Sequence, residues 1–120
     1  MDVSTVLVVD DSPTDLHLLN GYLESNGYRT LNATSGEEAL QKASSEHPDL
    51  ILMDVVMPGM NGFEATRSLS KNPQTRDIPV IVVTSKHQET DKIWAMRQGA
   101  RDFVSKPVDE KTLIGMIKSL

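Results

Sequence analysis

The sequence contains no cysteine, which excludes a disulfide framework, a thiolate nucleophile and a zinc–thiolate site. It is poor in positive charge, because 12 Lys and Arg stand against 17 Asp and Glu and give a formal net charge of −5. A nucleic-acid-binding protein needs a basic face to meet phosphates, so we expect no nucleic-acid partner. The longest apolar runs are four or five residues, whereas a transmembrane helix needs roughly 20. The N-terminus has no basic segment leading into an apolar stretch, so we expect no signal peptide, no membrane insertion and a cytoplasmic location.

The composition is that of one globular domain. Apolar residues make up 38% of the 120 residues and charged residues 24%, far from the profile of a disordered chain. Chains of this length usually share a single hydrophobic core. No linker, repeat or low-complexity stretch divides the sequence, so we expect residues 1–120 to form a single domain with no effector domain.

Short apolar runs alternate along the chain with segments of helical periodicity. Val6–Val9, Leu50–Met53 and Val80–Val83 are unbroken, which is typical of strands buried on both faces of a parallel sheet. Tyr28–Ala33 and Phe103–Val104 are weaker candidates for two more strands. Right-handed crossovers place helices on both faces of such a sheet. The pattern predicts an α/β (βα)5 fold with a doubly wound parallel sheet, and a flavodoxin-like strand order of 2-1-3-4-5 would make the first and third strands neighbours.

Capping residues mark the starts of the helices. Ser12 is an N-cap candidate and Pro13 fits the first helical position. Ser35 followed by Glu38 predicts a capping box before the second helix. Asp109 is expected to cap the fifth helix.

The fourth helix is predicted from an apolar stripe. Ile93, Met96 and Ala100 have helical spacing, and Gly99 suits the end of the helix. Trp94 either packs half-buried against the domain or anchors a partner, because Trp is enriched in binding hot spots.

Polar residues appear where the predicted strands stop. Asp10 and Asp11 follow the first strand, Asp54 follows the third, Thr84 ends the fourth and Lys106 ends the fifth. In doubly wound sheets, ligands bind at the carboxyl ends of the strands, where the strand order reverses. We therefore expect these five side chains to converge at one edge of the sheet.

The predicted cluster requires a cation. Three neighbouring carboxylates repel one another, and the single charge of Lys106 does not balance them. Hard oxygen ligands without His or Cys favour Mg²⁺ or Mn²⁺, and Mg²⁺ often completes its shell with phosphate oxygens. Asp54 lies centrally and is the best candidate for a nucleophile that forms an aspartyl phosphate, with Lys106 and Thr84 holding phosphoryl oxygens.

These residues belong to segments that resemble the CheY-like receiver domains of response regulators over essentially the whole chain. The matching segments are Val8–Ser12, Asp54–Gly62, Val83–Ser85, Gly99–Ala100 and Phe103–Pro107. Each segment alone is a weak signal, whereas five in register on the expected elements are highly specific.

The resemblance implies a role for each matching residue. Asp54 corresponds to the phosphoacceptor. Asp10 and Asp11 correspond to the acid pair that positions Mg²⁺, and Val56 to the residue whose backbone carbonyl also binds the metal. Lys106 corresponds to the lysine that binds the phosphoryl group.

The resemblance also implies a switch. Thr84 corresponds to the switch hydroxyl and Phe103 to the switch aromatic, which turns inward as the threonine moves. Pro107 follows Lys106 at a position where the peptide bond is cis in the family. Val56 and Lys86 occupy positions that flank the approach of water to the phosphoryl group, so they are expected to alter its lifetime.

A finer resemblance concerns the stand-alone receivers of type IV pilus twitching-motility systems. It rests on Gln88–Trp94, Arg97–Asp102 and Lys106–Glu110. It implies a single-domain response regulator that takes a phosphoryl group from a CheA-like histidine kinase. Its output would be altered binding of a downstream protein to the face formed by the fourth helix, fifth strand and fifth helix, or drainage of phosphoryl groups from the kinase. We do not expect an enzyme, beyond self-catalysed phosphorylation and dephosphorylation.

Two alternatives remain open from the residues alone. One is a phosphatase or phosphotransferase working through an aspartyl phosphate. Haloacid-dehalogenase-type enzymes, however, carry an Asp-x-Asp pattern, whereas Asp10 and Asp11 are adjacent and 120 residues leave no room for a cap domain. The other is an interaction module that is never phosphorylated. Such pseudo-receivers usually lose an acid or the lysine, and none is missing here.

Overall fold

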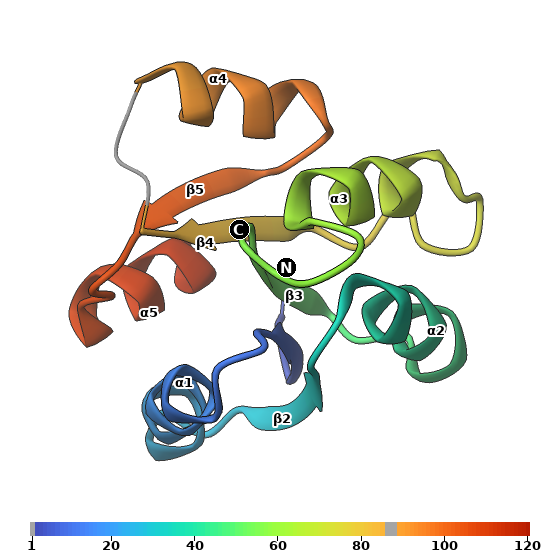
Figure 1. Ribbon diagram of the computed structural model, residues 1–120. Coiled ribbons are helices and arrows are strands. Elements are labelled where there is room, and N and C mark those ends of the chain that lie inside the picture. Colours follow the sequence, from blue (N-terminus) through green and yellow to red (C-terminus); the bar gives the residue numbers. More distant parts are fainter. Residues whose placement is uncertain (1, 86–88) are drawn as a thin grey trace.

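The computed structural model describes residues 2–85 and 89–120. Its centre is a five-stranded parallel sheet in the order β2-β1-β3-β4-β5, with helices on both faces (Figure 1). The strands are β1 (Thr5–Val9), β2 (Arg29–Ala33), β3 (Leu50–Asp54), β4 (Val80–Thr84) and β5 (Asp102–Ser105). The helices are α1 (Pro13–Ser25), α2 (Gly36–Glu46), α3 (Gly62–Lys71), α4 (Glu89–Arg97) and α5 (Glu110–Lys118). The predicted fold class and strand order are confirmed.

The unbroken apolar strands supply two cores, one on each face of the sheet. Leu7 and Val9 of β1 pack on the face covered by α2, α3 and α4, whereas Val6 and Val8 pack on the face covered by α1 and α5. Side chains alternate between faces along a strand, so a strand buried on both sides must be apolar throughout. This burial fixes the strands rigidly and therefore fixes where their carboxyl ends emerge.

The predicted caps are present, with one difference. The Ser12 hydroxyl accepts a hydrogen bond from the Asp15 N–H, and Pro13 opens α1. The Ser35 hydroxyl accepts from the Glu38 N–H, but the Glu38 carboxylate accepts from the N–H of Thr34 rather than that of Ser35. The first turns of both helices are thus held by side chains.

The predicted fourth helix is present as α4, but Ile93 and Met96 do not form its packing face. Helix α4 ends at Arg97, and Gly99 has a left-handed φ of 102°, so Ala100 lies beyond the helix. The small side chain of Ala95 is buried, whereas Ile93 and Met96 are largely exposed and Trp94 is 49% exposed. Helix α4 therefore docks through alanine and presents its larger apolar side chains outward.

Lys86, His87 and Gln88 lie outside the described residues. Within the part of the chain that the structure describes, no helix combines the length and hydrophobicity of a transmembrane span.

Candidate functional site

The sheet brings the predicted polar residues together at its carboxyl edge. Asp54 is the last residue of β3 and lies in register with Val83, one residue before Thr84 at the end of β4. Asp10 and Lys106 immediately follow β1 and β5. The strand order reverses between β1 and β3, which is where ligands bind in doubly wound sheets.

Three carboxylates form a compact cluster. Asp10, Asp11 and Asp54 each offer an oxygen, and these atoms lie within 4.8 Å of one another. Asp10 is 1% exposed and Asp54 is 5% exposed, whereas Asp11 faces solvent. Close carboxylates repel one another, the more so where they are buried, so the cluster favours a cation.

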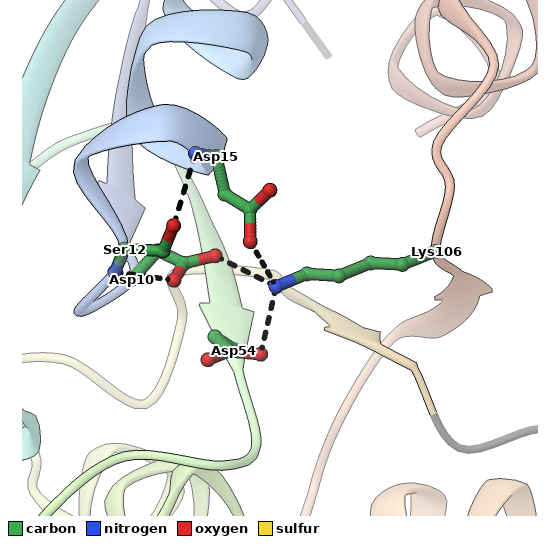
Figure 2. Close-up of polar contacts among 5 residues, drawn as sticks. All are labelled: Asp10, Ser12, Asp15, Asp54 and Lys106. Carbon is green, nitrogen blue, oxygen red and sulfur yellow. Dashed lines mark hydrogen bonds and ion pairs between the residues drawn. The ribbon is translucent and has the colours of Figure 1, made fainter.

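Lys106 is the cation nearest to this cluster among the described residues. Its Nζ lies 2.9 Å from Asp10 Oδ2 and 3.3 Å from Asp54 Oδ1 (Figure 2). It also lies 2.9 Å from Asp15 Oδ2, a contact that the sequence analysis did not anticipate. With Asp11, the four carboxylates and one ammonium carry a formal charge of −4 + 1 = −3. One lysine therefore leaves most of the negative charge uncompensated.

The charges shift the pKa values of two groups. Burial and the charge of Asp10 raise the pKa of Asp54 to about 6, although Lys106 acts in the opposite direction. Desolvation of Lys106 favours its neutral form, but hydrogen bonds to Asp10 and Asp15 outweigh it and raise the pKa of the ammonium. Lys106 is therefore charged at every physiological pH, and Asp54 is mostly ionised at neutral pH.

Local backbone contacts hold the acids in place. Asp10 Oδ1 accepts a hydrogen bond from the Ser12 N–H at 2.9 Å, at the turn into α1. The loop after Asp54 closes where the Gly62 N–H donates to the Val55 carbonyl at 2.9 Å. A Cβ at Gly62 would lie 2.0 Å from the Asp54 carbonyl oxygen, so α3 can start this close to β3 only with glycine.

The remaining predicted residues surround the cluster. Thr84 is fully buried, and its carbonyl accepts the Lys106 N–H at 2.7 Å. The Lys106–Pro107 peptide bond is cis. Phe103 is partly buried on β5 and pairs in register with Val82. Val56 is largely exposed in the loop after β3, and Lys86 lies outside the described residues.

The donor set fits a hard divalent cation. The three converging groups are carboxylates, and the cluster contains no His or Cys. Oxygen ligands of this kind suit Mg²⁺ or Mn²⁺ rather than a softer metal. Asp10, Asp11 and Asp54 are the residues able to hold such an ion.

Comparison with known proteins assigns the chain to a family. Residues 6–118 match the response regulator receiver domain. The chain is 52% identical over 118 residues to Protein PilH of Pseudomonas aeruginosa, and the match covers 98% of each chain. It is 41% identical over 115 residues to the response regulator PleD of Caulobacter vibrioides, covering 96% of this chain but 25% of PleD.

Solved structures agree with this assignment. The chemotaxis protein CheY4 of Vibrio cholerae superposes with a TM-score of 0.91 at 30% identity, with 98% of each chain covered. The predicted family is thereby confirmed: the chain belongs to the response regulator receiver domain family of two-component signalling proteins.

Proposed function

We propose that this receiver domain accepts a phosphoryl group on Asp54 from a histidine kinase. The observation that carries the proposal is the Asp54 carboxylate itself, which is buried at the end of β3, clustered with Asp10 and Asp11, and 3.3 Å from the Lys106 ammonium. The site thus combines a carboxylate suited to act as nucleophile, an acid pair suited to bind a cation and an ammonium suited to bind phosphate. Such an arrangement suits phosphoryl transfer, in which positioning and charge stabilisation dominate.

The transfer is a direct displacement at phosphorus. An ionised Asp54 oxygen forms the new O–P bond while the donor's N–P bond breaks, and the electron pair of that bond returns to the histidine nitrogen. The Lys106 ammonium donates a hydrogen bond to one phosphoryl oxygen and the Thr84 hydroxyl donates to another. Because the pKa of Asp54 is about 6, the nucleophilic form predominates at neutral pH.

Mg²⁺, or Mn²⁺, is the proposed cofactor, held by Asp10, Asp11, Asp54 and the Val56 backbone carbonyl. When bound, the ion supplies positive charge that offsets the negative charge of the phosphoryl oxygens. The carboxylates contribute the hard oxygen ligands, and their mutual repulsion favours binding.

Phosphorylation is proposed to shift a two-state equilibrium through Thr84 and Phe103. The output face would be the surface formed by α4, β5 and α5, where Ile93, Trp94 and Met96 are exposed. Converting a 1:99 population to 99:1 requires about 5.5 kcal/mol of differential stabilisation. A downstream protein would then bind one state in preference to the other.

We further propose that the chain acts as a stand-alone receiver in type IV pilus twitching motility, with a CheA-like kinase as phosphodonor. Support comes from the match to PilH, which covers 98% of both chains. The chain would signal through protein binding or drain phosphoryl groups from the kinase. It would turn over no external substrate, and its expected location is cytoplasmic.

The test is phosphorylation of the purified chain by acetyl phosphate and Mg²⁺, followed by intact-mass measurement. We expect a mass gain of one phosphoryl group that is lost in Asp54→Ala and absent with excess chelator. An unmodified wild-type chain, or an undiminished gain in Asp54→Ala, would overturn the proposal. Transfer from a phosphorylated CheA-like kinase then tests the identity of the donor.

A further inference from the structure

Lys106 has one more carboxylate partner than the proposed phosphoryl chemistry uses. Its ammonium donates hydrogen bonds to Asp10 and Asp15 and forms an ion pair with Asp54. The contacts to Asp10 and Asp15 are equal at 2.9 Å, and the contact to Asp54 is longer at 3.3 Å. Asp15 therefore holds the ammonium as closely as the buried Asp10 does.

Asp15 reaches Lys106 from a different element. It lies in the first turn of α1, where its N–H donates a hydrogen bond to the Ser12 hydroxyl. Its carboxylate points back toward the carboxyl edge of the sheet (Figure 2). The turn that caps α1 thus places both Asp10 and Asp15 against one ammonium.

The two functions required of Asp10 conflict. Its Oδ1 already accepts the Ser12 N–H and its Oδ2 accepts Lys106, so a divalent cation on Asp10 would meet the ammonium on the same carboxylate. Two like charges on one small group repel. Without a second anchor, the flexible lysine would either oppose the cation or leave the site.

We propose that Asp15 is a positioning residue for Lys106, which retains the ammonium on the α1 side of the site so that Asp10 can bind a divalent cation while Lys106 stays within reach of Asp54. This inference rests on the proposed function. It assigns to Asp15 a role that neither the acid pair nor the phosphoacceptor fills.

The test is a measurement of the Mg²⁺ dissociation constant. Binding is monitored by the shifts of amide resonances during a Mg²⁺ titration without phosphodonor. We expect Asp15→Asn to raise the Mg²⁺ dissociation constant about threefold to tenfold. The Lys106 ammonium then loses its Asp15 anchor and competes with the ion for Asp10. Glu64→Gln is the matched control, since it removes the same charge from the first turn of α3, at the same edge of the sheet. We expect less than a twofold change in that variant, in line with an exposed charge.

A double-mutant cycle separates positioning from simple charge. In a Lys106→Met background, Asp15→Asn should change Mg²⁺ affinity no more than Glu64→Gln does. Equal effects of Asp15→Asn and Glu64→Gln in the wild-type background, or an undiminished Asp15→Asn effect in Lys106→Met, would overturn the inference. A wild-type chain that binds no Mg²⁺ would instead contradict the metal site of the proposed function.

Discussion

Two aspartates bracket β3 and serve opposite edges of the sheet. Asp49 precedes the strand at the amino edge, and its Oδ2 accepts the N–H groups of Ser4 and Thr5, each at 3.0 Å. Asp54 ends the same strand at the carboxyl edge and faces two further carboxylates and one lysine. The same residue type thus ties two segments of backbone together at one edge and carries uncompensated charge at the other.

The difference separates an acid held by backbone donors from the proposed phosphoacceptor. Two backbone N–H groups donate to Asp49, and these hydrogen bonds offset the cost of its charge. Burial and the charge of Asp10 raise the pKa of Asp54 to about 6, so its charged form costs more than that of an exposed carboxylate, and a bound cation or a phosphoryl group would relieve that cost. Stability measurements on the two edges therefore distinguish the two roles.

The largest expected effect comes from crowding at the carboxyl edge. Gly62→Ala would place a Cβ 2.0 Å from the Asp54 carbonyl, so the backbone must move. We expect a loss of about 3 kcal/mol or more in the free energy of unfolding, measured by urea titration.

Gly21→Ala is the matched control for this crowding. Gly21 lies inside α1 with no atom within 4 Å of an added Cβ, so alanine should stabilise the chain by about 0.5–1 kcal/mol. Similar stabilities of Gly62→Ala and Gly21→Ala would mean that the loop after β3 is not tightly packed.

Neutralising Asp54 should stabilise the domain. Its pKa rises from 3.8 to about 6 on folding, and each unit is worth roughly 1.4 kcal/mol. We expect the free energy of unfolding of Asp54→Asn to exceed that of the wild type by up to about 3 kcal/mol near neutral pH. The measurement is a urea titration with chelator present. Added Mg²⁺ should narrow this gap, because it stabilises the ionised wild-type carboxylate.

The sign of the pH dependence follows from the same shift. A carboxyl group whose pKa is higher in the folded state stabilises the fold when protonated, fully below pH 3.8, and this contribution is lost as the pH rises through about 6. The advantage of Asp54→Asn should therefore shrink as the pH falls from about 7 toward about 4. The contrast between Asp54 and Asp49 would be lost if the difference in free energy of unfolding between Asp54→Asn and the wild type did not depend on pH. It would also be lost if Asp54→Asn were less stable than the wild type at neutral pH.

Of the two aspartate substitutions, the smaller effect is expected at the amino edge, with the opposite sign. Asp49→Asn keeps an oxygen acceptor for the N–H groups of Ser4 and Thr5 but loses the negative charge. The free energy of unfolding, measured by the same urea titration, should therefore fall by about 1 kcal/mol. A stabilising Asp49→Asn would show that this carboxylate, too, carries uncompensated charge.

The sequence was sufficient to predict the sheet and most of the carboxyl edge. Unbroken apolar strands specify burial on both faces, and parallel strands bring Asp10, Asp54 and Lys106 to one edge. The partnership of Asp15 was not predictable, because an acid in the first helical turn is equally typical of a helix-dipole contact. Its direction depends on the turn at Ser12 and on side-chain rotamers, which periodicity does not encode.

The packing face of α4 was not predictable for a related reason. A hydrophobic pattern predicts which face of a helix is apolar, but not whether the helix packs through that face. Helix α4 packs through Ala95, which leaves Ile93, Trp94 and Met96 accessible.

Site mapping tests the central claim most directly, because any of the three clustered carboxylates could in principle accept the phosphoryl group. The acetyl-phosphate-treated chain is reduced with borohydride, which converts an aspartyl phosphate to homoserine, and then digested and sequenced by mass spectrometry. We predict homoserine at position 54 and aspartate at positions 10 and 11. Homoserine at Asp10 or Asp11 instead, or at none of the three in a chain that gained the phosphoryl mass, would contradict the account.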